Sequence, residues 1–201
     1  MFIAFEGGEG AGKSTQVRLL HDWLRDSGHG VLVTFEPGDT AVGERLRAVL
    51  LGHETGELAP RTEALLYAAD RAEHVATVVA PALSEGMVVV TDRYLDSSIA
   101  YQGAGRELAA DDVARLSRWA TDGLLPNLTV LLDVDPEVGL QRFDTPADRL
   151  EAEPLAFHRR VRDGFRTLAA AAPQRYLVVD AARGPDEIHA QVRSRVAELL
   201  T

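Results

Sequence analysis

Five short apolar runs recur along the chain, each separated from the next by a longer segment of mixed character. The runs are rich in β-branched residues and lack regular polar alternation, which is typical of strands buried on both faces of a parallel sheet. They span residues 2–5, 31–35, 87–90, 128–132 and 176–179. Between them, helical spacing of apolar residues and Pro or Gly punctuation predict helices. These span residues 14–27, 42–51, 62–85, 111–121, 136–142, 154–172 and 185–200.

This alternation predicts the fold class α/β, with three layers: a five-stranded parallel sheet and helices on both of its faces. Ligands of such folds bind at the carboxyl ends of the strands. The 201 residues suit a single domain, residues 1–201, and no internal repeat or low-complexity linker divides them. A polar segment, residues 142–153, follows the fourth predicted strand, and we expect it to form a short mobile lid.

The loop after the first run carries the pattern Gly-x-x-x-x-Gly-Lys-Ser. It lies between a predicted strand and a predicted helix, the context in which such a loop holds phosphates. Backbone N–H groups and the helix N-terminus would face a polyphosphate, Lys13 would reach the outer phosphates, and the Ser14 hydroxyl would reach Mg²⁺. A plain glycine-rich turn is the disfavoured alternative. We therefore expect a P-loop NTPase fold that binds ATP along Gly7, Gly8, Glu9, Gly10, Ala11, Gly12, Lys13, Ser14 and Thr15.

Composition narrows the possible partners. The formal net charge of −10 argues against a broad nucleic-acid-binding face, because such affinity comes from neutralising many phosphates. No apolar run is long enough to span a bilayer, and the first residues do not resemble a leader. The absence of cysteine excludes disulfides and Cys-ligated zinc and is compatible with a reducing cytoplasm. We expect a soluble cytoplasmic protein that binds neither nucleic acid nor membranes.

Further polar clusters follow the predicted strands or lie on the long predicted helix. Glu36 follows the second strand, and Asp92 and Arg93 follow the third, where a carboxylate could hold Mg²⁺ or its water and a guanidinium could clamp a phosphate. A solvated surface ion pair is the alternative. On the helix, Tyr67 and Arg71 are four residues apart and share a face. They could stack on a base and bond its carbonyl, or be ordinary core edge and surface.

In this order the motifs resemble those of the bacterial thymidylate kinases, and the resemblance covers essentially the whole chain. Besides the phosphate loop, it rests on Phe5-Glu6-Gly7, Glu36-Pro37-Gly38, Ala69-Asp70-Arg71, Asp92-Arg93-Tyr94, Ser97-Ser98, Ala100-Tyr101-Gln102-Gly103 and Arg160-Val161-Arg162. It implies transfer of the γ-phosphoryl group of ATP to dTMP, giving dTDP and ADP, with Mg²⁺ required. It also implies a homodimer.

The resemblance implies how the base of dTMP would be bound. Tyr67 would stack on thymine, and Arg71 would bond a thymine carbonyl. Ser98 and Gln102 would complete base recognition.

It likewise implies how the sugar and phosphate would be bound. Glu9 would hold the sugar 3′-hydroxyl, and Tyr101 would lie where it crowds a 2′-hydroxyl. Arg47 and Arg93 would hold the acceptor phosphate, with Glu36 also among the substrate-binding residues.

Phosphoryl transfer depends on positioning and charge neutralisation, so Lys13, Mg²⁺ and an added arginine should carry most of the barrier reduction. The loop between Gly7 and Gly12 holds no basic residue. By resemblance the arginine comes from the lid, where Arg149 is favoured over Arg142. We therefore predict as catalytic residues Lys13, Arg93, Arg142 and Arg149, and as metal ligands Ser14 and Asp92.

Some positions depart from the family pattern or carry no chemistry. Many relatives have Arg and Gly where this chain has Phe35 and Asp39, so one acceptor-phosphate contact is missing or supplied elsewhere. The six histidines show no metal-ligand spacing, and we expect them at surface or capping positions. Trp23 and Trp119 lie on apolar helix faces, where we expect core or interface roles.

Two alternatives remain open at this stage. Another small P-loop kinase could act on a different monophosphate or on a small hydroxyl compound. A nucleotide-dependent switch ATPase could use the same loop, but it would have no use for an acceptor pocket lined by Tyr67, Arg71 and Arg93.

Overall fold

Five parallel strands form one sheet in the computed structural model, which describes residues 1–142 and 148–200. The strand order is β2-β3-β1-β4-β5. The strands are β1 (Phe2–Glu6), β2 (Val31–Phe35), β3 (Val88–Asp92), β4 (Leu128–Asp133) and β5 (Tyr176–Asp180). Each begins and ends within two residues of its predicted limits. Because β1 is central, the loop that follows it leaves the middle of the carboxyl edge of the sheet.

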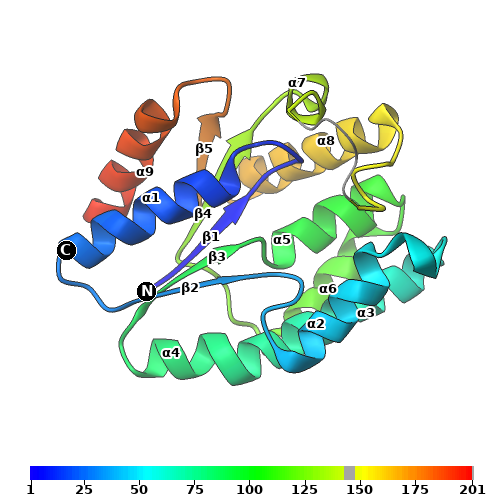
Figure 1. Cartoon of the computed structure of the whole chain (residues 1–201), viewed down its shortest axis with the longest axis horizontal. Coiled ribbons are helices and arrows are strands. Elements are labelled where there is room, and N and C mark those ends of the chain that lie inside the picture. Colours follow the sequence, from blue (N-terminus) through cyan, green and yellow to red (C-terminus); the bar gives the residue numbers. More distant parts are fainter. Residues whose placement is uncertain (143–147, 201) are drawn as a thin grey trace.

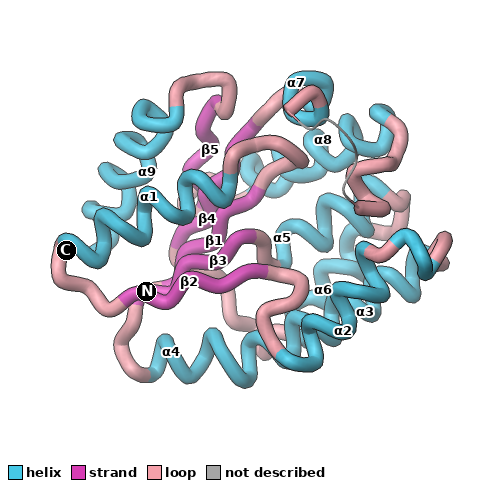
Figure 2. The backbone as a smooth tube through the Cα atoms, viewed as in Figure 1, coloured by secondary structure: helices cyan, strands magenta, loops and turns pink. Residues whose placement is uncertain are grey.

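Helices cover both faces of this sheet (Figures 1 and 2). The α-helices are α1 (Lys13–Asp26), α2 (Ala41–Leu51), α3 (Pro60–His74), α4 (Ala80–Ser84), α5 (Leu95–Ser98), α6 (Ala110–Ala120), α7 (Pro136–Leu140), α8 (Leu155–Ala171) and α9 (Pro185–Leu200). Two π-helical segments, η2 (Val75–Val79) and η3 (Ile99–Gly105), and a 3-10 turn, η1 (His53–Thr55), complete the helical structure of the described residues. None of these helices is both long and apolar enough to cross a bilayer.

Alternate side chains of the central strand β1 enter two different layers of the core. Ile3 and Phe5 pack in the cluster formed with α1 and α9, whereas Phe2 and Ala4 pack in the cluster formed with α4, α5 and α6. Both faces of β1 are therefore dry, which explains why the run has no polar alternation. The predicted three-layer α/β fold is confirmed.

The long predicted helix, residues 62–85, is a helical segment with a π turn inside it. α3 continues through η2 into α4, and the Ala80 N–H donates to the Val75 carbonyl five residues back. Pro81 follows immediately and has no N–H to donate to an α-helical ladder, so the wider turn lies where that ladder is already interrupted.

The helical stretch α5–η3 was not predicted. Residues 94–103 are all buried, so the segment has no polar face and no amphipathic period. Its sequence also holds Ser97, Ser98, Gly103 and Gly105, residue types that are poor helix formers. At Gly105 a Cβ atom would lie 2.7 Å from the Phe157 ring, so the small residue permits close packing of α8.

Candidate active site

The phosphate loop joins the end of β1 to the start of α1. Gly7, Gly10 and Gly12 have φ angles of 141°, 67° and 90°. A Cβ atom on Gly7 would also lie 2.5 Å from the Leu132 carbonyl oxygen, and one on Gly10 would lie 2.1 Å from that of Gly139. Only glycine suits these positions. Gly12 has no side chain with which to cap α1, so the N-terminal N–H groups of that helix are available to an anion.

Lys13 is folded back over the loop. Its Nζ donates to the carbonyl oxygens of Gly7 at 3.1 Å and Gly8 at 3.0 Å. Burial and the nearby Arg93 guanidinium lower the pKa of Lys13, while carboxylates around it oppose that shift. A phosphate in the loop would give this buried ammonium a negatively charged partner.

Two oxygen ligands suited to Mg²⁺ meet at the edge of the sheet. Strands β1 and β3 are paired so that Phe5 is opposite Asp92, and Ser14 Oγ donates to Asp92 Oδ2 at 3.0 Å. Hydroxyl and carboxylate oxygens are what this hard cation prefers. The described part of the chain has no cluster of three His, Cys, Asp or Glu residues that would cage a metal. The donor set therefore fits an ion held mainly by substrate phosphates.

Next to the loop, one carboxylate organises two other predicted substrate contacts. Glu9 Oε1 accepts from Arg93 Nη2 and from the Tyr101 hydroxyl, both at 2.6 Å, and the Arg93 guanidinium lies 5.0 Å from the Tyr101 ring centroid. Burial alone would raise the pKa of Glu9, but Arg93, Lys13 and the Tyr101 hydroxyl outweigh it and lower the pKa to about 2. Arg93 has a φ of 69°, which turns its side chain at the end of β3.

Glu6, the last residue of β1, binds the backbone around the start of α5. Its Oε1 accepts the backbone N–H groups of Tyr94 at 2.9 Å and Ser97 at 3.1 Å, which begin α5, and Ser97 Oγ lies 2.5 Å from its Oε2. Burial and the negative charge of Asp96 raise the pKa of Glu6 to about 8. The carboxyl group is therefore mostly neutral at pH 7.

The side chains predicted to bind a base lie together. Arg71 Nη1 donates to Ser98 Oγ at 3.1 Å, and its Nε donates to Glu36 at 2.8 Å. Tyr67 and Gln102 line the same cavity as Ser98. Arg71 itself is 1% exposed and lies behind this wall.

Two further predicted arginines line the cleft and donate to backbone carbonyls. Arg47 Nη1 donates to the Pro37 carbonyl at 2.7 Å, and its guanidinium lies 5.8 Å from the centroid of Phe35. Arg142 Nη1 donates to the Gly10 carbonyl at 2.6 Å. This contact brings it to the phosphate loop.

Arg149 is directed away from the loop. It donates to Glu63 at 2.5 Å and to the Leu50 carbonyl at 2.9 Å. The sequence ranked Arg149 above Arg142 as the catalytic donor. In the structure a buried carboxylate holds Arg149, whereas Arg142 contacts the phosphate loop. Of the predicted lid, residues 143–147 lie outside the described residues.

One cleft of about 860 Å³ links these groups. Its walls include nearly all of the predicted contacts, namely Glu9, Gly10, Ala11, Gly12, Lys13, Ser14, Thr15, Glu36, Arg47, Tyr67, Asp92, Arg93, Ser98, Tyr101, Gln102 and Arg142. Gly7, Gly8, Arg71 and Arg149 do not line it.

Several residues at the site were missed. Glu63 is fully buried and accepts from Gln102 at 2.9 Å, and Arg183 lines the cleft from the loop after β5. The expectation of surface or capping roles is wrong for His74 and His158, which are 1% and 4% exposed. A signal existed for two of these, because Glu63, Tyr67, Arg71 and His74 recur at helical spacing on α3. Polar residues on one helix face can mark a site as well as a solvated surface.

The chain matches proteins of known kind over its whole length. The family model described as thymidylate kinase matches residues 5–192. The thymidylate kinase of Clavibacter michiganensis subsp. michiganensis is 57% identical, covering 100% of this chain and 96% of the relative, and that of Cutibacterium acnes is 54% identical, covering 100% and 98%. The crystal structure of thymidylate kinase from Ehrlichia chaffeensis has a TM-score of 0.81 at 32% identity, covering 98% of each chain.

The chain belongs to the thymidylate kinase family. As a member of this family it is an ATP-dependent dTMP kinase, a phosphotransferase, and the predicted family, fold class and activity are confirmed. Neither alternative, another P-loop kinase or a switch ATPase, is favoured. The cleft lies at the carboxyl edge of the sheet, where the strand pattern predicted a ligand site.

Proposed function

We propose that γ-phosphoryl transfer from ATP to dTMP takes place directly inside this cleft. The observation that carries this proposal is that the phosphate loop and the aromatic and polar acceptor wall line one continuous cavity of about 860 Å³. A shared, partly enclosed cavity lets donor and acceptor meet in line and limits the access of water. A switch ATPase would not need the second half of this cavity.

On the donor side, the loop N–H groups and Lys13 would hold the ATP phosphates. Ser14 and Asp92 would hold Mg²⁺, which fits their oxygen donors and their 3.0 Å contact. When bound, the ion would neutralise phosphate charge. Arg142 would neutralise charge on the transferring group, a role supported by its contact with Gly10. Arg149 would instead anchor the lid base to Glu63.

On the acceptor side, Arg93 and Arg47 would hold the dTMP phosphate. Glu9 would accept the sugar 3′-hydroxyl, and its low pKa keeps it an acceptor at neutral pH. Tyr101, held by Glu9 at 2.6 Å, would leave no room for a 2′-hydroxyl.

The base would be bound farther along the same wall. Tyr67 would stack on thymine, and Ser98 and Gln102 would bond its edge. Arg71 would bond a carbonyl from behind Ser98. Glu36 would hold Arg71 in place by accepting from its Nε.

We also propose that the chain works as one domain, residues 1–201, with a lid at residues 142–153, and as a cytoplasmic homodimer. Exposed apolar side chains on neighbouring helices support the dimer: Leu65 on α3 is 58% exposed and Trp119 on α6 is 81% exposed. This exposure excludes a core role for Trp119. Light scattering after size exclusion would contradict the dimer if it returned the monomer mass of 21.8 kDa.

Initial rates over a matrix of ATP and dTMP concentrations test the proposal. Tyr67→Leu should raise KM for dTMP about tenfold, roughly 1.4 kcal/mol, with little change in KM for ATP. Lys13→Ala should lower kcat, and Arg115→Ala, an exposed site on α6, should change neither constant. Magnesium removal by a chelator should stop turnover, and added Mg²⁺ should restore it. Equal ATP consumption with and without dTMP would contradict direct transfer.

A further inference from the structure

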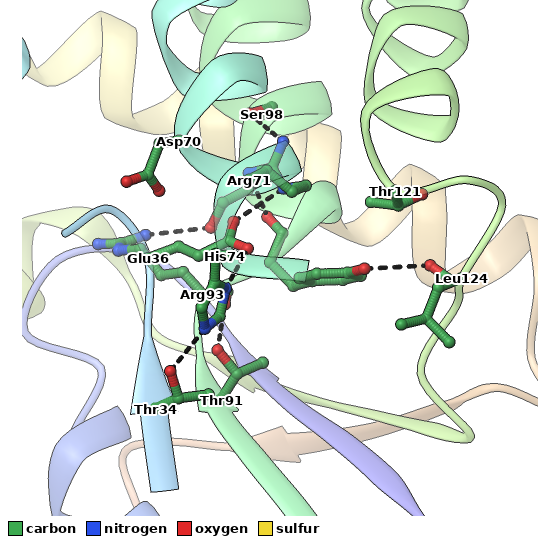
Figure 3. A network of polar contacts seen from close by, with 12 residues as sticks. Thr34, Glu36, Asp70, Arg71, His74, Thr91, Arg93, Ser98, Thr121 and Leu124 are labelled. Atoms are coloured by element: carbon green, nitrogen blue, oxygen red, sulfur yellow. Dashed lines mark hydrogen bonds and ion pairs between the residues drawn. The ribbon is translucent and has the colours of Figure 1, made fainter. Parts of the chain in front are cut away.

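A buried chain of hydrogen bonds runs behind the base pocket and joins β2 to α3 and α5 (Figure 3). Thr34 Oγ1 lies 2.6 Å from His74 Nε2, and His74 Nδ1 lies 2.9 Å from Glu36 Oε1. Glu36 Oε2 then accepts from Arg71 Nε at 2.8 Å. The His74 and Glu36 side chains are 1% and 2% exposed, so water cannot replace these contacts.

The Thr34 hydroxyl contacts a second polar side chain at the β2 end of this hydrogen-bonded network. Thr34 Oγ1 also lies 2.5 Å from Asp39 Oδ2, and an ionised carboxylate only accepts. Thr34 Oγ1 is thus held between Asp39 and His74 Nε2. The other ring nitrogen, Nδ1, faces the Glu36 carboxylate and donates to it. His74 therefore bridges Thr34 on β2 and Glu36.

Glu36 in turn sets the orientation of Arg71. With Nε fixed by Glu36, the guanidinium donates to Ser98 Oγ from Nη1 and to the Tyr94 carbonyl from Nη2, at 3.1 and 3.2 Å. Three of its five hydrogens are then used, and two remain on the terminal nitrogens. A Glu36 carboxylate held by Arg71 alone could rotate, and the plane of the guanidinium would rotate with it.

We propose that His74 is a positioning residue for base recognition, because it fixes Glu36 and thereby the guanidinium plane of Arg71. The inference rests on the proposed role of Arg71 at a pyrimidine carbonyl. His74 is 1% exposed and contacts Thr34 and Glu36, so we infer that it acts through Glu36 and Arg71 and not on the substrate directly. Its loss should weaken acceptor binding and leave ATP binding unchanged.

Two substitutions with side chains of different length test the two contacts of His74 separately, the one with Thr34 and the one with Glu36. In His74→Asn the amide nitrogen can take the place of Nδ1 and keep the contact with Glu36. In His74→Gln the amide can take the place of Nε2 and keep the contact with Thr34 while losing Glu36. We expect KM for dTMP to rise about tenfold in His74→Gln and less than about threefold in His74→Asn, with KM for ATP unchanged in both.

Base selectivity gives a second readout that a merely structural role would not move. An arginine only donates, so it favours a carbonyl and disfavours the amino group that cytosine carries at C4. His74→Gln should therefore lower the ratio of kcat/KM for dTMP to kcat/KM for dCMP, and Arg71→Lys should lower it as well. Thr34→Val keeps the volume of Thr34 and removes the outer anchor, and it should raise KM for dTMP by about threefold even if a His74 variant does not fold.

The outcomes distinguish the inference from the function on which it rests. Equal KM values for dTMP in His74→Gln and His74→Asn, beside a raised value in Arg71→Lys, would overturn the positioning role alone. An unchanged KM for dTMP in Arg71→Lys would contradict the proposed role of Arg71, and the inference with it. A parallel rise of both KM values in His74→Gln would reduce His74 to a structural residue.

Discussion

Replacing Glu6 by Gln should make the folded chain at least as stable as the wild type at pH 7, and its advantage should grow at higher pH. Glu6 is fully buried, its Oε1 accepts two backbone N–H groups, and its pKa is raised to about 8 by burial and by Asp96. A neutral carboxyl group and a carboxamide offer the same oxygen to those N–H groups. The amide nitrogen of Gln can also donate to Ser97 Oγ.

The size of the effect follows from the pKa. The folded state keeps a proton that the unfolded state, with its usual pKa of 4.5, has released, so wild-type stability falls as pH rises through this interval. Between about pH 7 and pH 9.5, a folded pKa of about 8 lowers wild-type stability by a further amount of roughly 1.4 kcal/mol. For a chain of this size that is roughly 3–6 °C in thermal midpoint. Gln has no proton to release, so the free energy of unfolding of Glu6→Gln should not fall in this way.

Thermal unfolding followed by circular dichroism at a series of pH values measures the difference directly. Glu85→Gln, at an exposed position after α4, is the matched control and should follow the wild type at every pH. The reasoning is refuted if the wild type and Glu6→Gln keep a constant difference from about pH 7 to pH 9.5, or if the variant is already several degrees less stable at pH 7.

Other substitutions test the site. Arg142→Ala should lower kcat by about 10²-fold with a small change in KM for dTMP, whereas Arg149→Ala should leave most of kcat and cost about 2 kcal/mol of unfolding free energy; the reverse pattern would restore Arg149 as the donor. Gly10→Ala should raise KM for ATP by at least about tenfold, because its Cβ atom would lie 2.1 Å from the Gly139 carbonyl oxygen; wild-type ATP kinetics would contradict the loop geometry. Tyr101→Ala should lower the ratio of kcat/KM for dUMP to kcat/KM for UMP about tenfold. An unchanged ratio would show that Tyr101 does not select the sugar.

The sheet could be predicted because its strands are apolar runs with short, sharp limits, and the three inner strands β1, β3 and β4 are buried on both faces. β1 shows why this works: Phe2 and Ile3 face opposite helix layers and both need apolar side chains. The α5–η3 helix could not be predicted for a related reason. A helix buried all round has no polar period, and Gly103 and Gly105 are read from sequence as turn residues.

The candidate site was predictable where chain order alone determines it. The phosphate loop follows β1 and Asp92 ends the adjacent strand β3, so their meeting at one edge follows from the topology. Contacts between side chains far apart in sequence were not predictable. Nothing in the order of the chain indicates that Glu36 lies against His74 or that Glu63 holds Arg149.

Acceptor specificity tests the central claim most directly. ADP release from ATP and Mg²⁺ would be measured with dTMP, dUMP, UMP, dCMP, AMP and GMP, beside a blank with no acceptor. The account predicts a low blank rate and a strong preference for dTMP. ADP release at the blank rate with every acceptor, or a preference for a purine or ribonucleotide, would contradict the account of the cleft.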